Sequence, residues 1–222
     1  MKLLKGKGIM YDYLLFDLDG TLTDPGEGIT NSVIYALKKW GIEVKDRREL
    51  YPFIGPPLSA SFSKYYGFSE SDSLKCVEYY REYFRDKGIF ENRVYSGIPE
   101  LLETLQRSGK RLVLATSKPE LFAKRILEHF DLTRYFFFVA GASMDESRNK
   151  KADVIRYALK ELGEPERDRV VMIGDREQDV TGAKLNGLDS IGVLYGYGDR
   201  EEHEQAGATY IAPTVMDILK FV

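Results

Sequence analysis

The sequence has little of what marks secreted, membrane-bound or nucleic-acid-binding proteins. Cys76 is the one cysteine among 222 residues, which excludes an intramolecular disulfide and a metal site built from cysteines. We expect Cys76 to be a half-buried residue of a helix and the protein to reside in a reducing compartment. The net charge of −3 comes from scattered signs and offers no basic stripe for a nucleic-acid backbone. No apolar run approaches the roughly 18–20 residues of a spanning helix, and MKLLKGKGIM at the start lacks the apolar stretch of a secretory signal. We therefore expect a cytoplasmic protein without nucleic-acid or membrane partners.

From Gly97 onward, short apolar runs alternate with helical patterns, which predicts an α/β domain with a parallel sheet. Near-continuous apolar runs are typical of strands that are covered on both faces. Such strands are expected at 14–16, 112–115, 136–140, 170–173, 191–194 and 209–211. Pro119 suits the first turn of a helix, whereas Gly109 and Gly163 stand where helices end in a left-handed residue.

The segment 25–92 differs, because it contains helical patterns and no convincing strand. Helices are expected at 28–40, 57–66 and 70–87, with glycine and proline breaks between them. We expect its many tyrosines and phenylalanines to be packing residues. The sequence therefore predicts an α/β core of residues 10–24 and 93–222 with an inserted helical domain of residues 25–92, and Met10 is a candidate for the natural start.

Two carboxylates, Asp17 and Asp19, follow the first strand in the run FDLDGTLTD. Alternation places both side chains on one side if the extended conformation continues. Two such carboxylates repel each other unless a cation lies between them or one is protonated, so the spacing indicates a metal or a shared proton. A hairpin turn at Asp19-Gly20 is disfavoured, because no returning strand follows.

A second acidic pair, Asp175 and Asp179, follows the strand in VVMIGDREQD. Asp179 lies one helical turn after Asp175, so both carboxylates can face one pocket. An oxygen-rich pocket of this kind suits a hard cation such as magnesium. N-capping by Asp175 would explain only one of the two residues.

Two weaker signals accompany these carboxylates. Thr116, Ser117 and Lys118 precede Pro119 and place hydroxyls at a helix N-terminus, where free amides attract phosphate; a plain helix cap is the alternative. Lys151 opens the KADVIRYAL helix after a polar loop, a position at which a solvated surface lysine is common.

In this order, the four features resemble the haloacid dehalogenase-like superfamily, and the resemblance covers the chain from about Met10. It is closest to the phosphoglycolate phosphatase-like branch, whose helical cap is inserted just after the first motif. The family pattern of DxDGTxxD, a hydroxyl, a lysine and GDxxxD is met by Asp17, Asp19, Thr116, Lys151, Asp175 and Asp179. The resemblance implies a Rossmann-like core and a magnesium-dependent phosphatase acting on a small phosphorylated metabolite.

The resemblance also implies a role for each residue. Asp17 would attack phosphorus and become an aspartyl-phosphate, and Asp19 would act as acid and then base. Phosphoryl oxygens would be held by Thr116 and Lys151, with Ser117 and Lys118 as further contacts. Magnesium would be held by Asp17, the Asp19 backbone carbonyl and Asp175, with Asp179 as a ligand or behind the ligands. The cap loop of Gly55, Pro56, Pro57 and Leu58 would select the leaving group.

Other readings remain open from the sequence. Phosphoglycolate, a nucleoside monophosphate, a sugar phosphate and pyrophosphate all present the same group to Asp17. A phosphosugar mutase shares the chemistry, although the mutases of this branch prefer valine at the place of Thr21, and a receiver-like phosphate sensor is a non-catalytic alternative. We expect a monomer or weak homodimer, and a simple strand-to-helix connection at 195–198.

Overall fold

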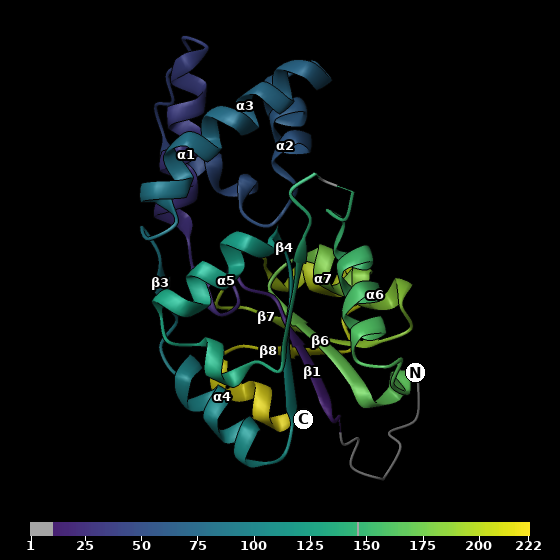
Figure 1. Cartoon of the computed structure of the whole chain (residues 1–222). Helices are drawn as coiled ribbons and strands as arrows, with labels where there is room; N and C mark the ends of the chain where they lie inside the picture. The colour runs from purple at the N-terminus through teal and green to yellow at the C-terminus, as the bar shows by residue number, and fades with distance from the viewer. Residues whose placement is uncertain (1–10, 146) are drawn as a thin grey trace.

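The computed structural model describes residues 11–145 and 147–222, which form an α/β core and a helical group beside it (Figure 1). The main sheet has the strand order β5-β4-β1-β6-β7-β8. Its strands are β1 (Tyr13–Phe16), β4 (Arg111–Pro119), β5 (Phe138–Ala142), β6 (Val170–Gly174), β7 (Asp189–Val193) and β8 (Tyr210–Ala212). All neighbouring strands in it are parallel, as the sequence predicts.

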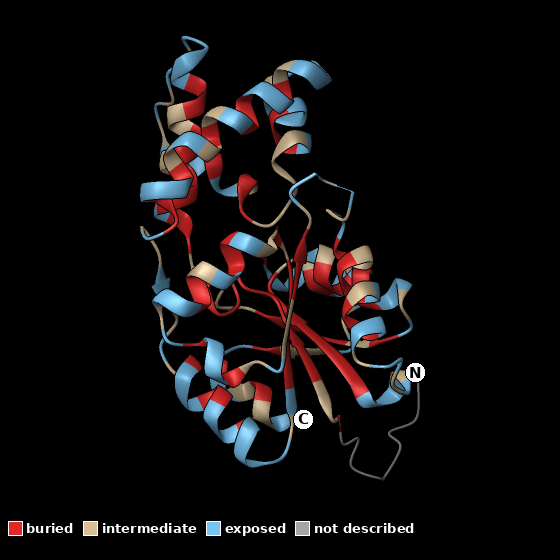
Figure 2. Ribbon diagram, viewed as in Figure 1, coloured by how far each residue is buried: buried red, intermediate tan, exposed pale blue. Residues whose placement is uncertain are grey.

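Helices cover both faces of this sheet, so its strands are buried in Figure 2. The core helices are α4 (Ile98–Arg107), α5 (Glu120–His129), α6 (Lys151–Glu161), α7 (Glu177–Leu185) and α8 (Arg200–Ala206). Alternation divides each strand between two apolar clusters: Leu14 and Phe16 join the cluster with α4, whereas Leu15 joins the one with α6. The side-chain period of two thus explains why these strands are apolar throughout.

Element ends differ slightly from the sequence predictions. Gly109 and Gly163 follow their helices with φ of 78° and 80°, which confirms the left-handed ends. Pro119 instead closes β4 and caps α5, which begins at Glu120. The strand predicted at 136–140 lies at 138–142, because Phe136 still belongs to the end of a 3₁₀ turn, η3 (Thr133–Tyr135).

The helical group consists of α1 (Gly26–Lys39), α2 (Leu58–Tyr66) and α3 (Glu70–Tyr83), together with the 3₁₀ segment η1 (Arg47–Phe53). The helix predicted at 70–87 changes to a π turn, η2 (Phe84–Gly88), after Tyr83. Cys76 is fully buried rather than half-buried, because α3 packs against α1 and Cys76 belongs to the same apolar cluster as Ala36 and Leu37 of that helix. Burial raises the pKa of its thiol to about 11.

The chain passes between the two parts at two short strands that lie side by side. β2 (Thr23–Asp24) pairs antiparallel with β3 (Arg93–Val94), and Arg93 forms an ion pair with Asp24 at 2.6 Å. The helical group stands beyond the carboxyl ends of the core strands (Figure 1). The boundaries at residues 25 and 92 stay a prediction, and Met10 lies outside the described residues. Among the described helices, none combines the length and apolarity that crossing a bilayer needs.

Candidate active site

The residues singled out in the sequence meet at the carboxyl edge of the three central strands. Asp17 follows β1, Thr116 lies near the end of β4 and Asp175 follows β6. Lys151 and Asp179 come from the first turns of α6 and α7. Because β4, β1 and β6 are parallel neighbours, their ends lie close together. All five residues are buried, so Lys151 is not the surface lysine that its sequence context alone would favour.

Lys151 lies between two of the carboxylates. Its Nζ is 2.8 Å from Asp17 Oδ1 and 2.8 Å from Asp179 Oδ1, and it donates to the carbonyl of Ala115 at 3.0 Å. Burial lowers the pKa of Lys151, but Asp17 and Asp179 together outweigh burial and raise it above its ordinary value. Lys151 therefore stays charged and holds Asp17 in a fixed orientation.

Three of the carboxylates form a group that can hold a metal. Asp17, Asp175 and Asp179 each offer one oxygen, and these oxygens lie within 4.8 Å of one another. Burial, and then the charges of Asp179 and Asp17, raise the pKa of Asp175 well above its usual range. Burial also raises the pKa of Asp179 to about 6, although Lys151 opposes the shift. A bound cation would remove this repulsion, because it favours the ionised form of each carboxylate.

Close backbone approaches fix the shape of this group. Gly20 has a φ of 84°, and a Cβ atom there would lie 2.0 Å from Asp175 Oδ2, so glycine is required for both reasons. The backbone N–H of Tyr197 donates to the same Asp175 oxygen at 2.9 Å. Asp179 Oδ2 accepts from the backbone N–H of Arg176 at 3.1 Å. The first motif thus requires glycine at position 20, because the Asp175 carboxylate of the last motif lies directly against it.

Asp19 does not belong to this group of three carboxylates and is paired with a different lysine. Lys118 Nζ lies 2.7 Å from Asp19 Oδ2 and 4.6 Å from the ring centre of Phe84 in the helical group. Burial raises the pKa of Asp19, the Lys118 charge opposes that shift, and Asp17 adds to it. Lys118 is buried, so it is not a surface lysine, and its contact with substrate stays a prediction. Its backbone N–H donates to Thr116 Oγ1 at 3.2 Å.

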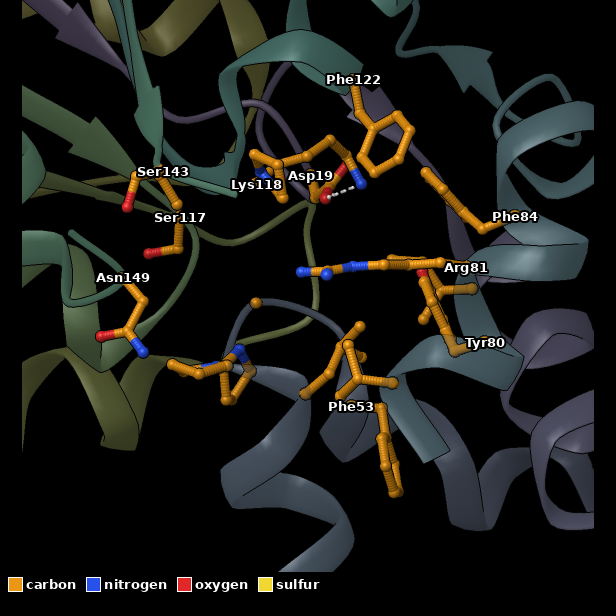
Figure 3. Close-up of a pocket in the computed structure, with 18 residues that line it drawn as sticks. Asp19, Phe53, Tyr80, Arg81, Phe84, Ser117, Lys118, Phe122, Ser143 and Asn149 are labelled. Carbon is orange, nitrogen blue, oxygen red and sulfur yellow. Dashed lines mark ion pairs between the residues drawn. The ribbon is translucent and has the colours of Figure 1, made fainter. Parts of the chain in front are cut away.

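A cavity of about 90 Å³ lies beside Asp19, between the core and the helical group (Figure 3). Ser117 and Lys118 line it from the core, and Gly55, Pro56, Pro57 and Leu58 line it from the helical group. Asp17, Asp175 and Asp179 do not line it, so they lie deeper than Asp19. The structure therefore brings the loop of Gly55 to Leu58 and the motif residues Asp19, Ser117 and Lys118 to one cavity.

The cavity also uses residues that the sequence did not single out. Tyr80, Phe84 and Arg81 come from the α3–η2 segment, and Arg81 extends across the cavity toward the side of Ser117 and Asn149 in Figure 3. These aromatics were expected only to pack, and here they pack and line the cavity. Ser143 and Asn149 come from the loop after β5. The position of that loop after a parallel strand was a usable signal, since sites collect at such ends.

The segment 195–198 is more than the simple connection that the sequence favoured. It does join β7 to α8, but Tyr195 donates its hydroxyl to the Thr21 carbonyl at 3.1 Å, and the Tyr197 hydroxyl bonds Asp24. A Cβ on Gly196 would lie 2.3 Å from the Gly20 carbonyl oxygen. The connection therefore closes over the first motif.

Comparisons of sequence and structure show which known proteins this chain resembles. The sequence model described as "Haloacid dehalogenase-like hydrolase" matches residues 14–193. A 5'-nucleotidase of Pseudomonas aeruginosa is 47% identical over 199 residues, covering 90% of each chain. A crystal structure titled as a predicted phosphatase from Clostridium acetobutylicum is 53% identical, with a TM-score of 0.93 over 95% of this chain and 97% of that one.

A further relative has a different printed activity. The tyrosine-protein kinase PtkA of Mycobacterium tuberculosis is 39% identical over 89% of this chain and 67% of its own length. Its solved structure has a TM-score of 0.82, at 37% identity and with 95% of this chain and 97% of that one covered. The relatives thus share the fold and differ in the phosphoryl chemistry for which they are named.

Proposed function

The chain belongs to the haloacid dehalogenase-like hydrolase family, and we propose that it is a magnesium-dependent phosphatase that hydrolyses small phosphate monoesters through an aspartyl-phosphate at Asp17. The observation that carries this proposal is the convergence of Asp17, Asp19 and Lys151 at the sheet edge, beside a cavity. A cluster of charged residues that only stabilised the fold would balance its own charges and would need no adjacent cavity.

The charges of the site support a dication. Four carboxylates, Asp17, Asp19, Asp175 and Asp179, face two ammonium groups, Lys118 and Lys151. With all six ionised, four negative and two positive charges leave two negative charges, which one Mg²⁺ would neutralise. With Asp19 protonated for the first chemical step, one negative charge remains, and the bound dication would leave the site positive toward a phosphate. The all-oxygen donor set suits a hard ion. We propose Asp17, the Asp19 carbonyl and Asp175 as ligands, with Asp179 as a ligand or as their support, and the bound ion would offset charge on the phosphoryl oxygens.

The first chemical step uses Asp17 as the nucleophile. A carboxylate oxygen attacks phosphorus, and Lys151, already 2.8 Å from Asp17, is placed to offset negative charge that develops on the phosphoryl oxygens. Thr116, behind Lys118 at the end of β4, is the hydroxyl proposed to hold another phosphoryl oxygen. Asp19 gives its proton to the oxygen of the departing alcohol, a task that suits a carboxyl whose pKa burial has raised.

The second step regenerates the enzyme. Asp19, now ionised, takes a proton from water, and the water oxygen attacks the phosphorus of the aspartyl-phosphate. Phosphate leaves, and Asp17 returns to its carboxylate form. Lys118 stabilises the ionised form of Asp19 in this half of the cycle, because it lies 2.7 Å away. The helical group covers Asp19 and keeps bulk water from the site.

The cavity walls favour a leaving group with a planar or apolar surface. Phe53, Tyr80, Phe84 and Phe122 contribute rings, and Arg81 and Ser117 contribute polar groups. Nucleosides combine a flat ring with hydroxyls, and the Pseudomonas relative is named for 5'-nucleotides. We therefore propose 5'-nucleoside monophosphates as the first substrates to test, ahead of phosphoglycolate, sugar phosphates and pyrophosphate.

A phosphate-release screen over these esters, with Mg²⁺ and with chelator, tests the proposal. We expect turnover of at least one ester, loss of activity on chelation and recovery when Mg²⁺ is returned. The Asp17→Asn variant should fold and show no turnover, because its amide is neutral and a poor nucleophile. Near-native activity in Asp17→Asn would end the mechanism. Conversion of a sugar phosphate to its isomer without phosphate release would favour the mutase instead.

A further inference from the structure

The loop that bears the metal-site carboxylates also touches the cap loop. Arg176 stands between Asp175 and the first residue of α7, and its Nη1 donates to the Ile54 carbonyl at 2.8 Å. Ile54 directly precedes the cavity-lining residues Gly55 to Leu58. The two residues are 122 positions apart in sequence, so this contact exists only when the helical group is seated on the core.

The Arg176 side chain is held in place from the core side. Its Nε lies 2.9 Å from Glu202 Oε1, and the same oxygen accepts from the backbone N–H of Glu177 at 2.6 Å. The arginine and glutamate side chains are only 17% and 21% exposed. Glu202 thus fixes the guanidinium at a site where its second nitrogen reaches the cap, a geometry that a single ammonium group cannot reproduce.

Two further observations show that the contact between Arg176 and Ile54 lies where the cap loop meets the core. Gly55 has a φ of 105°, and a Cβ there would lie 3.2 Å from Arg176 Cγ, so the cap loop passes close over the arginine. Beside it, the ring of Tyr197 lies 5.8 Å from that of Tyr51 in η1, and the Tyr197 N–H donates to Asp175. The cap segment 51–55 therefore packs on Arg176, which follows Asp175 in the chain, and on Tyr197, whose backbone N–H donates to Asp175.

We propose that Arg176 is a positioning residue that holds the cap loop over the cavity, and so couples closure of the cap to the loop that carries Asp175 and Asp179. The kinetic part of this proposal rests on the phosphatase function proposed above. Arg176 does not line the cavity, so its effect reaches the substrate through the seating of Gly55 to Leu58. Substrates with a leaving group that fills the cavity should depend on it, whereas a small acyl phosphate should not.

The test compares Arg176→Ala and Arg176→Lys with Arg200→Ala. Arg200 is an exposed α8 arginine paired with Glu204, so its loss changes the net charge equally. We expect Arg176→Ala to lower kcat/KM for the best ester by about tenfold, the typical effect of losing one hydrogen bond to a charged group. Phosphoenzyme formation from acetyl phosphate should stay within about twofold of wild type. Arg176→Lys should recover part of the loss, and Arg200→Ala should match wild type.

Hydrogen–deuterium exchange gives a readout that is independent of activity. Peptides covering 47–64 should exchange about tenfold faster in Arg176→Ala, while peptides from α4 stay unchanged. Equal losses for ester and acetyl phosphate with unchanged loop exchange would overturn the proposal, because Arg176 would then support only the metal-site loop. If the wild type hydrolyses no ester, the proposed function fails, and the exchange of residues 47–64 alone decides whether Arg176 holds the loop.

Discussion

At the scale of single residues, the site places two identical side chains in different environments. Asp17 and Asp19 are two positions apart, yet Asp17 faces Lys151 in the carboxylate group and Asp19 faces Lys118 under the ring of Phe84. Burial raises the pKa of Asp19 more than Lys118 lowers it. Environments that separate two carboxylates in this way are the usual basis for separate roles in one reaction.

The roles proposed for Asp17 and Asp19 can be distinguished with one substitution. In Asp19→Asn, ester turnover should fall by about 10²–10⁴-fold, the usual contribution of general acid–base catalysis. Acetyl phosphate has a good leaving group that needs little protonation, so Asp17 should still become phosphorylated. Its hydrolysis should be slow, because no base activates water. Rapid-quench labelling or mass spectrometry should therefore detect a phosphoenzyme that accumulates in Asp19→Asn.

Asp17→Asn provides the control for that experiment, since it should acquire no label from acetyl phosphate. If Asp19→Asn hydrolyses its phosphoenzyme as fast as wild type, Asp19 is not the base. Label on any residue other than Asp17 would move the nucleophile elsewhere.

At the scale of helices and strands, sequence patterns predicted the features that depend on neighbouring residues in the chain. The apolar runs located the strands, and residues directly after them, such as Asp17 and Asp175, were found because a parallel sheet gathers its carboxyl ends. The contact of Arg176 with Ile54 could not be predicted, because it depends on how the helical group seats on the core. Burial of Cys76 was underestimated for the same reason: α1 supplies the covering residues. No periodicity reports such long-range contacts.

The cap loop between η1 and α2 is the element expected to select the leaving group. Leu58 lines the cavity with Pro57, whereas the phosphoryl group would be held by Thr116 and Lys151 of the core. Changing Pro57 and Leu58 should therefore shift the ratio of kcat/KM values between esters by about tenfold, or about 1.4 kcal/mol of differential transition-state binding. A panel of specificity constants measures this ratio, with acetyl phosphate as the substrate that makes few cap contacts.

Leu185→Ala is the matched control, because Leu185 is 75% exposed on α7 and does not line the cavity. Its specificity ratios should equal those of wild type. A common decrease for every ester in the Pro57 and Leu58 variants would mean that the loop supports cap closure and does not choose among substrates.

At the scale of the whole molecule, the buried carboxylates carry an electrostatic cost, which a bound cation would reduce. Asp175 is fully buried and Asp179 almost so, and both have raised pKa values because of burial and neighbouring carboxylates. The surrounding sheet and the connection at 195–198 hold these groups together despite their repulsion. Ligand binding to the folded state alone adds to stability by mass action, so binding of the proposed metal would be linked to proton binding and to folding.

This linkage predicts how thermal stability depends on Mg²⁺ and pH. Unfolded aspartates ionise near pH 4, whereas Asp179 has a folded pKa of about 6. The folded state therefore binds more protons between these values, and the metal-free protein loses this part of its stability as pH rises through about 6. Mg²⁺ at a hundredfold excess over its Kd should add about 2.7 kcal/mol near pH 7.5, or about 5–10 °C in Tm for a chain of this size.

The Mg²⁺-dependent rise in Tm should shrink markedly at pH 5, because protons and the metal compete for the same oxygens. Scanning calorimetry at both pH values, with Mg²⁺ or chelator, measures the difference. Asp175→Asn should melt at least as high as wild type without metal, since it removes one repelling charge, and should lose the Mg²⁺ increment. Asp131→Asn is the matched control: Asp131 is exposed and has a φ of 55°, which asparagine also adopts. A Mg²⁺ increment that is equal at both pH values, or that persists in Asp175→Asn, would place the metal at other groups.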